Sequence, residues 1–325
     1  MIKSPDWLTR LFLYPFYRRY VWMPGKKMRG KPPLLLPEEL MLRDKLQQHV
    51  DVLASKIGER SIKTPDQLRR AEQYVVKEFQ QLGYKVWQHA FKFGGLEMHN
   101  FMIVKEGLDP RAGSIVVGAH YDTVPGTPGA DDNATGVGGL IELARWLRHQ
   151  QLDKTVRLVA FANEENNGGP WESMGSYHFA QLCRAQRYDV RAMLSLEMLG
   201  VFSDARGSQQ YPDPFGAFYP RIANFIAFVG NQASKALVHE CVGHWRQNVG
   251  FPCEGVAAPD KLRDAGRSDH WSFWQIGVPA LMITDTSNFR YPLYHTREDT
   301  ADKIDFDRYT RVVSGVFELV RKLAA

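Results

Sequence analysis

Apolar runs of strand length alternate with amphipathic helical patterns along most of the chain. Mostly apolar runs, typical of buried strands, occupy residues 114–118, 156–161, 193–196 and 279–284. Apolar residues at helical spacing predict helices over residues 37–50, 64–83, 136–150 and 305–323. Two alternating segments, 84–91 and 98–104, predict a hairpin. This order favours an α/β fold: a single three-layer domain with a mostly parallel mixed sheet flanked by helices.

Residues 1–36 break this pattern, and we expect them to form a basic, aromatic N-terminal arm and linker ahead of one domain over residues 37–325. Three arginines and Pro15 interrupt the aromatic run 7–22, whereas a membrane-spanning helix needs about 20 mostly apolar residues. A secretory signal is a poor match, because no small-residue cleavage site follows. Two interpretations stay open: contact with a membrane surface through residues 7–22, or packing on the arm's own domain or on a partner subunit. We expect the protein to be cytoplasmic or peripheral to a membrane.

The net charge of +5 belongs to this arm. Residues 1–32 hold eight basic residues and one acidic residue, a charge of +7, whereas the rest of the chain has 33 basic and 35 acidic residues, a charge of −2. The nearly neutral body argues against a nucleic-acid-binding surface. The three cysteines show no CxxC spacing, so isolated buried thiols and a bridge between Cys241 and Cys253 both remain open.

Acidic residues and histidines follow the predicted strands, or lie on a loop entering a helix, at five places. They are His120 with Asp122, Asp131 with Asp132, Glu164 with Glu165, Glu197, and His295. In open α/β sheets, ligands bind beyond the carboxyl ends of the strands, so these side chains can converge. Imidazole and carboxylate ligands suit zinc, cobalt or manganese, and two ions about 3.5–4 Å apart can share a carboxylate and hold a hydroxide between them. The sequence thus predicts a metal hydrolase.

Six short motifs, in order along the chain, resemble those of the zinc-dependent exopeptidases of the M28 type, a family of aminopeptidases, glutamate carboxypeptidase and glutaminyl cyclase. They are Gly-Ala-His-Tyr-Asp (118–122), Pro-Gly-Ala-Asp-Asp-Asn (128–133), Asn-Glu-Glu (163–165), Leu-Glu-Met (196–198), Ser-Asp-His (268–270) and Tyr-His-Thr (294–296). The resemblance covers residues 40–325 and implies a zinc-exopeptidase-like fold.

The resemblance also implies a role for each matching residue. His120 and Glu197 would hold one zinc, Glu165 and His295 the other, and Asp131 would bridge the two ions. Glu164 would be the general base and Asp122 the acid behind His120. Asp269 resembles a supporting acid, and a cis peptide is implied between Asp131 and Asp132. Two features depart from the family pattern: Glu197 stands where many members have Asp, and the segment 166–174 is longer than the link in the aminopeptidases.

The leading hypothesis is an aminopeptidase with two zinc ions, or cobalt or manganese in their place, that hydrolyses the N-terminal peptide bond of a peptide substrate. A zinc-bridging hydroxide would attack the carbonyl, with Glu164 as general base. One alternative is a glutaminyl-cyclase-like aminoacyltransferase with one zinc, although such an enzyme has no evident use for all five ligands. Another is a non-catalytic interaction module on the same fold.

Overall fold

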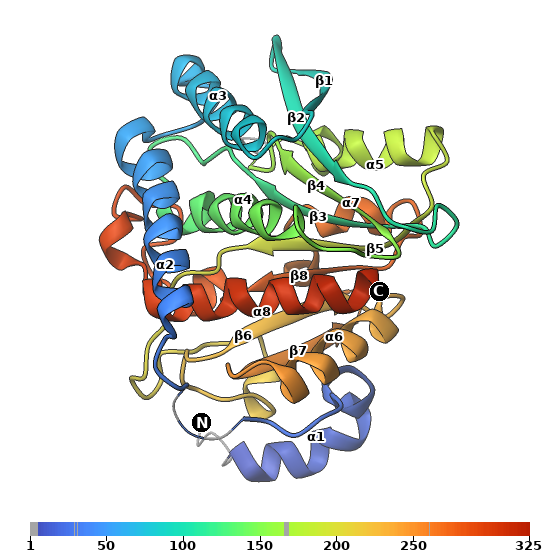
Figure 1. Ribbon diagram of the computed structural model, residues 1–325. Helices are drawn as coiled ribbons and strands as arrows, with labels where there is room; N and C mark the ends of the chain where they lie inside the picture. The colour runs from blue at the N-terminus through green and yellow to red at the C-terminus, as the bar shows by residue number, and fades with distance from the viewer. Residues whose placement is uncertain (1–5, 29, 31, 166–168, 260) are drawn as a thin grey trace.

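The computed structural model describes residues 6–28, 30, 32–165, 169–259 and 261–325 (Figure 1). Within them, one eight-stranded sheet has the strand order β1-β2-β4-β3-β5-β8-β6-β7. The four central strands β4, β3, β5 and β8 are mutually parallel, whereas the β1–β2, β2–β4 and β6–β8 pairs are antiparallel. The strands are β1 (Trp87–Phe93), β2 (Leu96–Lys105), β3 (Ser114–His120), β4 (Thr155–Phe161), β5 (Val190–Glu197), β6 (Ile226–Asn231), β7 (Cys253–Ala258) and β8 (Ala280–Thr284). The predicted mixed sheet is confirmed.

Helices cover both faces of this sheet and complete three layers (Figure 1). One face carries α2, α3, α4, α6 and α8 over the larger apolar core, and the other carries α5 and α7 over a smaller core that includes Phe161, Phe179 and Phe273. The helices are α1 (Asp6–Val21), α2 (Pro37–Val50), α3 (Pro65–Gln81), α4 (Gly136–Leu147), α5 (Gly175–Ala185), α6 (Lys235–Asn248), α7 (His270–Trp274) and α8 (Phe306–Ala324). A π-helical turn, Asp51–Ile57, follows α2, and a kinked segment, Ala130–Thr135, with non-helical backbone at Asp132 and Asn133, precedes α4.

The central strands form because both of their faces are covered. All seven residues of β3 are buried, as its apolar run predicts for a parallel strand between two helical layers. Gly118 in β3 is required by packing, since a Cβ there would lie 2.1 Å from the Phe161 ring. The closing helix α8 begins as predicted, with the Asp305 side chain accepting a hydrogen bond from the Arg308 amide at 3.0 Å.

The N-terminal arm folds back on the domain. Helix α1 lies beside β7 and the turn Phe215–Ala217, at the end of the molecule beyond α6 (Figure 1). Among the described residues, no helix has the length and apolar character to cross a membrane. Cys183, Cys241 and Cys253 are buried free thiols, so of the two alternatives for the cysteines the isolated thiols are confirmed.

Candidate metal centre

The predicted site residues lie on elements that end at one edge of the sheet. His120 and Glu197 are the last residues of β3 and β5, and Glu164 and Glu165 follow β4. His295 lies on the loop after β8, and the loop that enters α4 carries the two aspartates. Because β3, β4, β5 and β8 run parallel, their carboxyl ends meet at this edge. Site residues as far apart in the sequence as His120 and His295 therefore lie close together.

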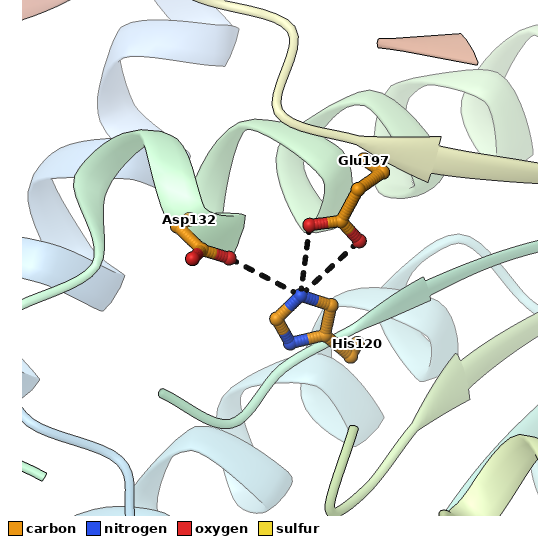
Figure 2. A group of neighbouring side chains, drawn as sticks. All are labelled: His120, Asp132 and Glu197. Atoms are coloured by element: carbon orange, nitrogen blue, oxygen red, sulfur yellow. Dashed lines mark hydrogen bonds and ion pairs between the residues drawn. The ribbon is translucent and has the colours of Figure 1, made fainter. Parts of the chain in front are cut away.

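Two groups of donor atoms converge there and share one residue. His120 Nε2 lies 3.3 Å from an oxygen of Asp132 and 3.3 Å from an oxygen of Glu197, as Figure 2 shows. His295 Nε2 lies 3.0 Å from the other oxygen of Asp132 and 3.2 Å from Glu165. In each group the three ligand atoms lie within 4.8 Å of one another. Asp132 therefore stands between the two groups and gives one oxygen to each.

This geometry corrects the sequence prediction that Asp131 is the bridge. Asp131 belongs to none of the donor groups, and its Oδ1 accepts a hydrogen bond from the Gly200 amide at 2.9 Å. Adjacent residues of the loop project in different directions, and the backbone turns Asp132 toward the histidines. The cis peptide likewise joins Asp132 to Asn133, not Asp131 to Asp132. Both differences amount to a shift of one residue along the loop.

Asp122 lies behind His120, where the sequence analysis expected an acid. Its carboxylate oxygen is 3.5 Å from His120 Nδ1, and its main-chain carbonyl is 3.2 Å from the same nitrogen. A carbonyl only accepts, so Nδ1 carries a proton, and Nε2, which faces Asp132 and Glu197, is the nitrogen available to a metal ion. The Asp122 carboxylate also accepts from the amides of Glu164 and Glu165, at 3.1 and 3.2 Å. Asp122 thus positions three of the predicted site residues.

Glu164 faces the same centre. Its carboxylate forms a third group with His120 and Glu165, within the same 4.8 Å limit. It also lines a cavity of about 310 Å³ together with Glu165, Tyr294 and His295. This position, beside the donor groups and open to the cavity, is the one required of a base that acts on a water next to bound ions.

Several supporting residues were not found by the sequence analysis. Arg60 is fully buried beneath the site, and its guanidinium donates to the carbonyls of Tyr121, Pro128 and Gly129, at 2.7, 2.6 and 3.0 Å. Ser268 Oγ donates to Glu197 at 2.7 Å. The Tyr294 ring stacks on His295 with 3.6 Å between ring centroids. Ser268 and Tyr294 lie in the Ser-Asp-His and Tyr-His-Thr motifs but were given no role there, and Arg60 lies in none of the motifs.

The side chains of Asp269 and its neighbour His270 have different surroundings. Burial raises the pKa of Asp269 to about 7, against the opposing charge of His120. His270 donates from Nε2 to the Ala265 carbonyl at 2.7 Å, and its ring packs edge-on against Trp274. Within the described residues, His270 belongs to none of the donor groups. Asp269 is therefore placed as a buried acid behind the site, and His270 as a structural residue.

Negative charge exceeds positive charge in the site. Burial, together with neighbouring carboxylates, raises the pKa of Glu164 well above its usual value and that of Glu165 to about 8. Burial disfavours the charged form of His295, but Asp132 and Glu165 outweigh it and raise its pKa to about 10. The two histidines in turn hold the pKa of Asp132 below its usual range despite burial. Without added positive charge, the protein keeps these carboxylates together only by holding protons among them.

The donor set fits divalent metal ions. Among the described residues, no group meets either oxygen of Asp132 or Nε2 of His295 in hydrogen-bonding geometry, although all three atoms are buried. Buried polar atoms without partners are costly, and a cation at the centre of each group would satisfy them. Imidazole nitrogens with carboxylate oxygens are ligands that zinc accepts readily.

A second, apolar cavity of about 120 Å³ opens beside the donor groups. Its lining includes Glu197, which belongs to a donor group, together with Arg267 and Tyr294. Its other walls are mainly aromatic and aliphatic, and they include Tyr211, Phe215, Tyr219, Phe225, Met282 and Phe289. The site therefore combines a polar centre with an adjoining apolar pocket, the usual composition of a small-ligand site.

Comparison with known proteins agrees with this geometry. Residues 101–320 match the sequence profile of peptidase family M28. The chain is 36% identical over 288 residues to the uncharacterized protein YfbL of Escherichia coli K12, covering 85% of this chain and 87% of YfbL. It is 28% identical over 222 residues to aminopeptidase YwaD of Bacillus subtilis 168, covering 64% of this chain and 41% of YwaD. It is 25% identical to leucine aminopeptidase 1 of Leptosphaeria maculans, covering 65% of this chain and 52% of that protein. The chain thus spans about half the length of these two aminopeptidases.

Solved structures share the fold. BSAP, a zinc aminopeptidase from Bacillus subtilis, superposes with a TM-score of 0.69 at 15% identity, over 90% of this chain and 96% of BSAP. The LapA aminopeptidase of Legionella pneumophila gives 0.68 at 21% identity, over 91% and 78%. A glutaminyl cyclase from Fimbriiglobus ruber gives 0.65 at 21% identity, over 92% and 99%. From the profile match, the shared fold and the donor groups, the chain belongs to peptidase family M28 and is a metal-dependent peptidase.

Proposed function

We propose that the protein is an aminopeptidase that holds two divalent ions, most suitably zinc, and removes the N-terminal residue of peptides. The observation that carries the proposal is the shared position of Asp132. One ion would be held by His120, Asp132 and Glu197. The other would be held by Asp132, Glu165 and His295. Such a pair supplies Lewis acidity for the peptide carbonyl and for water.

The chain's own residues supply the proton transfers. Glu164 takes a proton from the attacking water and passes it to the leaving amine. The amides of Glu164 and Glu165 are fixed on the Asp122 carboxylate, so the base and its neighbouring ligand keep a constant separation from His120. The cavity in front of Glu164 admits the substrate.

The apolar pocket supports a preference among substrates. Its aromatic wall adjoins Glu197, so it is placed to receive a side chain of a peptide held at the centre. Burying a large apolar side chain there contributes roughly 1.5–3 kcal/mol relative to leaving it exposed. We therefore expect kcat/KM to be higher for N-terminal leucine or phenylalanine than for glycine or aspartate, as measured on a panel of dipeptides. Equal rates across the panel would remove this pocket from substrate recognition.

The central test is Glu164→Gln. We expect the variant to keep its metal content and to lose turnover by about 10²–10⁴-fold, because the amide binds no proton. Elemental mass spectrometry gives the ions per chain, and dipeptide hydrolysis gives kcat. Glu172→Gln, which changes an exposed acid in the nearby turn Trp171–Ser173, is the matched control.

The same measurements separate the other functions. One ion per chain with cyclisation of N-terminal glutamine would indicate the glutaminyl-cyclase reaction. No ion after reconstitution, and no turnover, would indicate a non-catalytic module. Normal hydrolysis by Glu164→Gln would refute the assigned base.

A further inference from the structure

The N-terminal helix α1 has one face packed on the protein. The Tyr17 ring stacks on Phe218 with 5.6 Å between centroids and meets Phe215 edge-on at 5.9 Å. Tyr14 also packs against Phe218, at 6.4 Å. These contacts hold the helix on the domain, so its opposite face has a fixed direction.

That opposite face is aromatic and exposed. Phe12 is 70% exposed and Phe16 is 72% exposed, and their spacing of four residues places them on the same side of the helix. Arg19 continues this side one turn further on, with the exposed Arg18 beside it. Two exposed phenylalanines on one side of a helix leave adjoining apolar surface in water, and covering that surface with an apolar partner is favourable. The helix therefore presents an apolar ridge bordered by arginines.

The charge distribution indicates what this ridge meets. Residues 1–32 carry a formal charge of +7, and the rest of the chain carries −2. In the described part of the chain, neither Arg18 nor Arg19 forms an ion pair with an acidic side chain. A second copy would bring another arm of the same positive charge against this one, which is unfavourable. An anionic surface is complementary to the arm.

We propose that the outer face of α1 docks the protein on the surface of an anionic phospholipid membrane. Phe12 and Phe16 insert at the boundary between headgroups and acyl chains, and Arg18 and Arg19 contact lipid phosphates. The helix lies parallel to the membrane, because its inner face stays bound to Phe215 and Phe218. Figure 1 shows α1 at the outer end of the molecule, where a flat surface can reach it. This inference does not depend on the proposed function.

The test is sedimentation of the full chain with lipid vesicles. One set contains phosphatidylcholine alone, and in the other about a third of the lipid is phosphatidylglycerol, enough for a negative surface potential. We expect binding to the anionic vesicles only, and weaker binding at high salt because surface charge is screened. Phe12→Ser with Phe16→Ser should lower the partition coefficient more than tenfold, and Arg18→Gln with Arg19→Gln should lower it about tenfold.

Two controls keep the result interpretable. Trp87→Ser with Leu108→Ser changes two exposed apolar side chains elsewhere, and it should bind like the parent protein. Thermal melting checks that every variant is folded. The proposal is overturned if the parent binds neutral and anionic vesicles equally, binds neither, or is unaffected by the phenylalanine changes. It is also overturned if light scattering without lipid shows a dimer that the phenylalanine changes dissociate, since the ridge would then be a contact between copies.

Discussion

Asp131 and Asp132 are adjacent, but their surroundings are opposite. Asp132 lies between two histidines that keep it charged, whereas Asp131 accepts from the Gly200 amide and lies near Asp285. Burial and the charge of Asp285 raise the pKa of Asp131 well above its usual value, which favours its protonated form. Only one of the two carboxylates is therefore arranged to bind a cation.

Substitution by asparagine distinguishes the roles of the two aspartates in metal binding. We expect Asp132→Asn to lose most of its bound metal, because an amide oxygen is a weaker ligand and carries no charge. Asp131→Asn should keep the ions, because Asp131 belongs to none of the donor groups and asparagine has the same shape. The measurement is metal per chain after dialysis. If only Asp131→Asn loses metal, the bridge belongs to Asp131 after all.

At this scale the sequence indicated most of the residues whose donor atoms the structure brings together. His120, Glu164, Glu165, Glu197 and His295 were found because each follows a strand that ends at the same edge of the sheet. The sequence pattern could not decide between Asp131 and Asp132, because the direction of a loop side chain depends on the backbone angles of a single residue. Arg60 was missed because its partners are main-chain carbonyls, which no pattern of side chains reveals.

Two loops that carry donor residues are tied together by Asp299. Its carboxylate accepts from the amides of Asp131 and Asp132, at 3.0 and 3.1 Å, and from the hydroxyl of Tyr291 at 3.1 Å. Asp299 lies four residues beyond His295. One side chain thus links the segment that holds His295 to the loop that holds Asp132, two ligands of the second donor group.

Removing this link should affect both stability and metal binding. In Asp299→Ala two buried amides lose their acceptor, which we expect to cost roughly 2–5 kcal/mol of unfolding free energy. Metal affinity should fall by about 10–100-fold, the usual effect of losing a group that orients ligands. Denaturant titration and competition with a fluorescent chelator measure the two effects. Asp302→Ala, an exposed acid in the same segment, should change neither, and equal behaviour of the two variants would contradict the linking role.

For the whole molecule, the central sheet was predictable but its far edge was not. Strands β3, β4, β5 and β8 have apolar runs bounded by polar residues, whereas β7 contains Glu254 and small residues and has little strand pattern. Glu254 is tolerated because Arg246 and Lys27 reach it from α6 and the arm. Those partners come from distant segments, so local patterns could not indicate them. Of the two interpretations of the arm, packing on its own domain is confirmed for the inner face of α1, whereas membrane contact is the proposal for its outer face.

Because the arm contacts residues that line the apolar pocket, we expect cleavage of the arm by a protease to report ligand binding. Lys27 Nζ lies 2.5 Å from Glu254, and Arg246 donates to the carbonyls of Met23 and Pro24. Glu254 and Phe215, which pack against the arm, also line the pocket. If a ligand in the pocket stabilises the packed arm, the packed arm raises the affinity for that ligand by the same factor, because the coupling is reciprocal. We expect a non-hydrolysable dipeptide analogue with a leucine side chain to slow tryptic cleavage after Lys26 and Lys27, as followed by intact mass. Unchanged cleavage at saturating analogue would show that the two ends of the protein act independently.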